Sequence, residues 1–81
     1  MSWTVTYYQE DGKKYEGDTR IKKVIIDESV IEITERAFFN CTLLREIEWG
    51  DSNCKRIGRG AFYNTGLCEV HLPDSVEVIG R

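Results

Sequence analysis

The sequence lacks the features that mark membrane proteins, nucleic-acid-binding proteins and secreted proteins. No stretch approaches the roughly 20 apolar residues that a membrane-spanning helix needs, so we expect no membrane insertion. Lys and Arg number 11 against 14 Asp and Glu, and the formal net charge is −3. The basic stripe that nucleic acid requires is therefore missing. The first residues contain no basic segment followed by an apolar block, which predicts an intracellular protein without a secretory signal.

Cysteine and histidine are also scarce, with three cysteines and one histidine in the chain. An odd number of cysteines without the spacing of a disulfide framework favours a reducing compartment. We predict that Cys41 is an inert core residue and that Cys54 and Cys68 are more accessible, with a disulfide between these two as an alternative. A zinc site at Cys54, Cys68 and His71 would lack a fourth ligand. Because His71 also has no nucleophile or oxyanion donor beside it, the sequence indicates no enzyme, no metal and no cofactor.

The chain does contain a four-residue motif that occurs twice. Residues 37–40 read AFFN and residues 61–64 read AFYN, and apolar residues outside this motif recur at steps of 22–24 residues. A period in this range is typical of repeat proteins, in which each unit buries its apolar face only by stacking on its neighbours. The predicted ladders of equivalent residues are Ile21/Leu44/Leu67, Val24/Ile47/Val70, Ile26/Trp49/Leu72, Ile33/Ile57/Ile79 and Phe38/Phe62.

Each unit contains one segment in which apolar residues alternate with polar ones, which predicts a short strand with one buried face. These segments are residues 24–26, 47–49 and 70–72. Because the chain runs the same way in every unit, we predict that the strands stack in parallel. Residues 29–33 and 75–79 predict shorter second strands. Residues 34–39 and 58–63 predict one helical turn each, with Thr34 as an N-cap.

The N-terminal residues do not fit the repeat. Alternation over residues 3–8, followed by Asp11-Gly12, is a strong signal for a β-hairpin. The terminal strand of a stacked repeat exposes unpaired backbone groups and apolar side chains. We therefore predict a hairpin cap over residues 1–18, and about two and a half repeat turns over residues 19–81. The predicted cap contacts are Trp3, Val5, Tyr7 and Tyr15.

Two surfaces are candidates for binding a partner. The first is the exposed face of the predicted strands, where outward residues form columns, a common contact surface in repeat proteins. These outward residues are Lys23, Ile25, Glu46, Glu48, Glu69 and His71. The second is the C-terminal edge, where the apolar ladders end without a polar cap. Its residues are Leu72, Val76 and Ile79.

Two longer patterns contain the repeated four-residue motif. I-x-x-x-A-F-x-N-C-x-x-L-x-x-I-x-W runs from Ile33 to Trp49, and I-G-x-x-A-F-x-N-T-G-L-x-x-V-x-L-P-x-S-V-x-x-I-G runs from Ile57 to Gly80. Both resemble the BspA-like leucine-rich repeat, although Trp49-Gly50 stands where Leu-Pro is usual. The resemblance implies a solenoid that makes protein–protein contacts and carries no chemistry of its own. Such repeats occur in surface adhesins of host-associated bacteria and in intracellular proteins of protists and algae.

These observations predict an α/β repeat fold: a short leucine-rich-repeat solenoid with parallel strands, brief helical turns and an N-terminal β-hairpin cap. The predicted function is a non-catalytic protein-interaction or structural module. We expect a small subunit of a larger assembly, in which a partner protein or a second copy covers the C-terminal edge. The alternative is a fragment of a longer repeat-containing surface adhesin.

Overall fold

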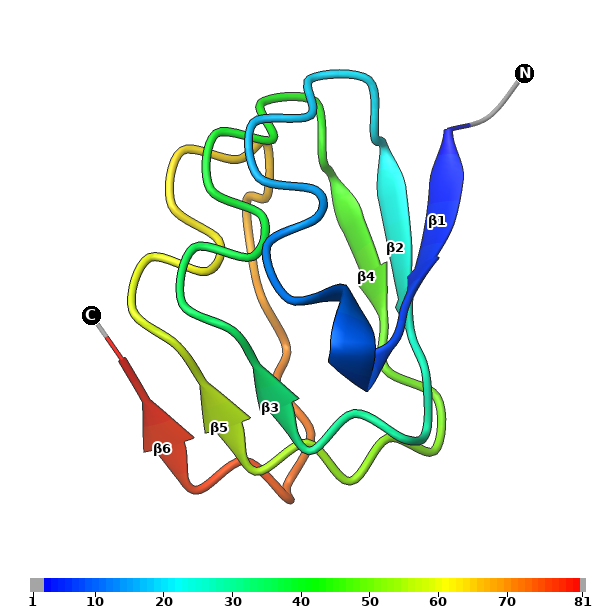
Figure 1. Cartoon of the computed structure of the whole chain (residues 1–81), viewed down its shortest axis with the longest axis vertical. Helices are drawn as coiled ribbons and strands as arrows, with labels where there is room; N and C mark the ends of the chain where they lie inside the picture. Colours follow the sequence, from blue (N-terminus) through cyan, green and yellow to red (C-terminus); the bar gives the residue numbers. More distant parts are fainter. Residues whose placement is uncertain (1–2, 81) are drawn as a thin grey trace.

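The computed structural model describes residues 3–80, which wind repeatedly between two small sheets (Figure 1). In chain order the elements are β1 (Thr4–Tyr7), the 3-10 helix η1 (Gln9–Asp11), β2 (Lys23–Ile26), β3 (Glu32–Ile33), β4 (Glu46–Glu48), β5 (Arg56–Ile57) and β6 (Val78–Ile79). No helix in this part of the chain has the length and apolar character needed to cross a membrane. We refer to the successive windings as unit 1 (residues 3–20), unit 2 (21–43), unit 3 (44–66) and unit 4 (67–80).

Both sheets are parallel. The first has the strand order β1-β2-β4 and the second has the order β3-β5-β6. Val24 lies opposite Ile47 in the first sheet, while Ile33, Ile57 and Ile79 form one row across the second. The predictions of parallel strands and of this register are confirmed. A register shifted by one residue would turn the apolar row towards solvent.

The centre of the molecule is a stack of three aromatic rings, one from each of units 1 to 3. Phe38 is fully buried between Tyr15, at 6.1 Å between ring centroids, and Phe62, at 5.7 Å. Interplanar angles of 6° and 4° make the three rings nearly parallel. Tyr7 packs a tilted ring against Phe38 at 5.1 Å. The aromatic ladder is therefore one member longer than the sequence indicated, because Tyr15 belongs to it.

The predicted helical turns of units 2 and 3 are not formed. In the first of them, residues 34–39, Phe38 donates its backbone N–H to Ala61 of the next unit at 2.8 Å. The residues on either side of Phe38 close turns within their own unit. Arg36 and Asn40 have φ angles of 61° and 63°, in the left-handed region, which interrupts a right-handed helix. Hydrogen bonds to the neighbouring unit thus replace the hydrogen bonds of a helix.

The predicted β-hairpin is wrong as well. β1 lies at the edge of the first sheet and pairs in parallel with β2, and the chain from Gly12 onward forms turns instead of a returning strand. This arrangement places Val5 and Tyr7 in the rows of the first sheet and lets Tyr15 stack on Phe38. The burial of these rings outweighs the turn preference of the Asp-Gly pair. The N-terminal residues therefore add a strand to the first sheet and a ring to the aromatic stack, as unit 2 does, but add no strand to the second sheet.

The predicted third strand of the first sheet, residues 70–72, is not formed, so this sheet ends at β4. Pro73 follows directly and has no N–H to contribute to a strand. Val70, which the sequence placed in a buried row, is 41% exposed. Unit 4 therefore contributes β6 to the second sheet and no strand to the first.

Two side chains close the edge of β3 that faces unit 1. The Gln9 side-chain carbonyl accepts hydrogen bonds from the backbone N–H of Ile31, at 2.6 Å, and of Glu32, at 3.1 Å. The Gln9 amide nitrogen donates to the Glu32 carbonyl at 3.0 Å. The Tyr7 hydroxyl accepts a longer bond from the N–H of Thr34, at 3.5 Å. In units 3 and 4 the equivalent N–H groups bond to the backbone of the preceding unit, so Gln9 imitates a peptide group.

Replacing Phe38 by Ala should lower the free energy of unfolding by about 3–5 kcal/mol, because a fully buried ring is lost from the middle of the stack. Phe62 is only partly buried, so Phe62→Ala should cost less. Phe39→Ala removes a ring from outside the core and is the matched control. Urea denaturation followed by circular dichroism measures all three. Equal losses for Phe38 and Phe62 would contradict the central position of Phe38.

Replacing Gln9 by Ala should lower the free energy of unfolding by about 1–2 kcal/mol, since three hydrogen bonds to a strand edge are lost. Hydrogen exchange at the amides of Ile31 and Glu32 should accelerate more than exchange elsewhere in the second sheet. The control is Glu10→Ala, a change at the neighbouring exposed position. Unchanged exchange at Ile31 and Glu32 in Gln9→Ala would show that the side-chain amide does not close this edge.

Candidate functional site

Four of the six outward residues that the sequence singled out lie together on the first sheet. Lys23 lies opposite Glu46, and Ile25 lies opposite Glu48, in the register of β2 and β4. The Lys23 Nζ is 3.3 Å from Glu46 Oε2 and 3.4 Å from Glu48 Oε1. The hydrogen bond and charge of Glu46, followed by those of Glu48, raise the pKa of Lys23 above its usual value. On this surface, two carboxylates therefore share the ammonium group of Lys23.

The other two predicted residues, Glu69 and His71, form a separate pair in unit 4. His71 Nε2 is 3.4 Å from Glu69 Oε2, and the two side chains are 89% and 80% exposed. They lie in the segment that forms no strand, so no sheet register joins them to Lys23. Within residues 3–80, no three or more His, Cys, Asp or Glu side chains are grouped so that they could hold a metal ion. The six residues thus form two groups rather than one column.

The C-terminal edge carries an apolar surface. Val70, Val78 and Ile79 are 41%, 53% and 56% exposed, while Leu72 and Val76 are partly buried and pack against the core. Val70, Leu72, Val76 and Ile79 of unit 4 are called the C-terminal face below, whereas Val78 aligns with the exposed Arg56 on the outer side of the second sheet. Ile79 lies in β6, the last strand of the second sheet.

A shallow groove lies on the side of units 2 and 3 and was missed by the sequence analysis. Its lining includes the stacked pair of Phe39 and Tyr63, with ring centroids 5.4 Å apart. The Arg36 guanidinium carbon lies 4.1 Å from the Phe39 ring, and Arg36 Nε is 2.7 Å from Glu16 Oε2. The groove has a volume of about 480 Å³. The sequence signal that could have indicated this groove is the second aromatic residue of the repeated motif. The lining residues are Glu35, Arg36, Phe39, Arg59, Gly60 and Tyr63.

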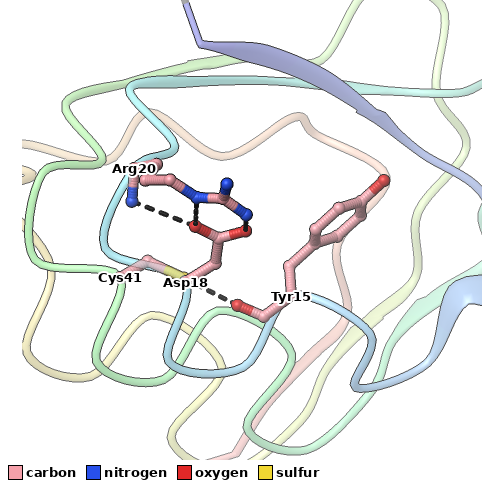
Figure 2. Close-up of polar contacts among 4 residues, drawn as sticks. All are labelled: Tyr15, Asp18, Arg20 and Cys41. Atoms are coloured by element: carbon pink, nitrogen blue, oxygen red, sulfur yellow. Dashed lines mark hydrogen bonds and ion pairs between the residues drawn. The ribbon is translucent and has the colours of Figure 1, made fainter.

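The thiol of Cys41 is buried, as predicted, and serves a corner between units 1 and 2. Its Sγ donates to the Tyr15 carbonyl at 3.0 Å, close to Asp18 (Figure 2). Burial raises the pKa of the Cys41 thiol. The backbone N–H of Arg20 donates to Asp18 at 3.0 Å and, as the largest cause, lowers the pKa of that carboxyl group. The corner is thus held by polar contacts within unit 1 and by one thiol of unit 2.

Cys54 is also fully buried, which corrects the prediction of an accessible thiol. It occupies in unit 3 the inward position that Val30 holds in unit 2, and both side chains are fully buried. Its Sγ donates to the Arg56 carbonyl at 3.3 Å, and burial raises the pKa of this thiol. Cys68 is exposed, as predicted, and all three cysteines are free thiols. The alternative of a bond between Cys54 and Cys68 is therefore not seen.

Comparison with known proteins identifies the repeat. The family described as a BspA type leucine rich repeat region (6 copies) matches residues 12–81. No curated protein and no solved structure matches the chain. The matched region begins within the first unit, before Tyr15, the first ring of the aromatic stack. Because the match covers most of the sequence, the chain belongs to the BspA-type leucine-rich repeat family.

Proposed function

We propose that this protein is a non-catalytic protein-binding module whose partner covers the C-terminal face. The main support for this proposal is one row of residues in the second sheet. Ile33 is fully buried, Ile57 is 5% exposed and Ile79 is 56% exposed, although the three residues are identical in type and aligned in register. A following unit covers the first two, and no unit within residues 3–80 covers Ile79. A partner that supplied this cover would bury Ile79 as its equivalents are buried.

The hydrophobic effect would provide the binding energy. Each Å² of apolar surface removed from water contributes roughly 25 cal/mol, and contiguous apolar patches on small soluble domains usually mark interaction sites. A chain of this length has a thin stability margin, because small domains bury a smaller share of their surface. A partner that binds only the folded form would also stabilise it. This argument supports a small subunit of a larger assembly. The repeat family, which is typically non-enzymatic, supports a protein-interaction role.

The outward residues of the first sheet have a secondary place in this proposal. Lys23, Glu46 and Glu48 already pair with one another, and exposed ion pairs contribute little to affinity. Charged residues at the rim of an interface chiefly affect the association rate and the choice of partner. We therefore assign Lys23, Ile25, Glu46 and Glu48 to the rim of a contact, and the apolar residues of unit 4 to its centre.

Replacing Val70 and Ile79 by Ser should abolish binding of the partner without unfolding the chain, because both side chains already lie partly in solvent. Affinity capture with wild type and variant, followed by identification of the bound proteins, measures this. The matched control is Leu43→Ser, which removes an apolar side chain that is 39% exposed outside the C-terminal face. Light scattering after size exclusion and circular dichroism establish the mass and fold of each variant.

Three results distinguish the possible surfaces. A partner that is held by wild type and by Leu43→Ser, and lost from the Val70/Ile79 variant, supports the proposal. A partner that is lost instead from Glu46→Ala/Glu48→Ala would move the binding centre to the first sheet. A folded Val70/Ile79 variant that retains every partner of the wild type would refute the role of the C-terminal face.

A further inference from the structure

We draw no further inference here: the strongest candidate, the shallow groove beside the Phe39 and Tyr63 rings on units 2 and 3, is lined by charged side chains of both signs, and nothing among the described residues shows what would occupy it.

Discussion

The stack of Phe38 between Tyr15 and Phe62 is the contact on which the other features of the fold depend. No unit is thick enough to enclose its own aromatic ring, so each ring is buried only when a neighbouring unit lies on each side of it. The parallel sheets, the left-handed corners and the hydrogen bonds between units all hold successive windings at the distance that ring stacking requires. Stability in such a molecule belongs to the interfaces between units rather than to the units themselves.

Because each unit depends on its neighbours, the first and last units of the described chain differ from the interior ones. At the first end, polar side chains take over what a preceding unit would do: Gln9 supplies the hydrogen bonds of a missing strand, and the Tyr7 ring fills space while its hydroxyl reaches Thr34. At the other end of the described chain, Val70 and Ile79 lie partly in solvent. The first end is thus closed by side chains of the chain itself, and we propose that a partner covers the other.

The sequence predicted the parallel register because identical spacing of apolar residues has few structural solutions. It misplaced the helical turns because a single turn has no helical periodicity to detect, and because the φ angles at Arg36 and Asn40 depend on the neighbouring unit. It misread Asp11-Gly12 because a local turn preference is weaker than the burial of Tyr15. The groove at Phe39 and Tyr63 was missed because only the core-forming residues of the repeated motif were considered. Cys54 was misplaced because its position in the repeat was treated as a loop.

Glycines at the start of the corners of units 3 and 4 let each of these units approach the preceding one closely. A Cβ atom on Gly58 would lie 2.6 Å from the Cα of Glu35, and one on Gly80 would lie 2.6 Å from the backbone nitrogen of Arg59. In unit 2 the same position is Thr34, where the neighbour is the Tyr7 hydroxyl rather than a backbone, and a side chain fits. A side chain is thus tolerated where the chain caps itself and excluded where backbone meets backbone. A partner strand that continued the second sheet beyond Gly80 would meet the same steric limit, so shape restricts what can cover the C-terminal face.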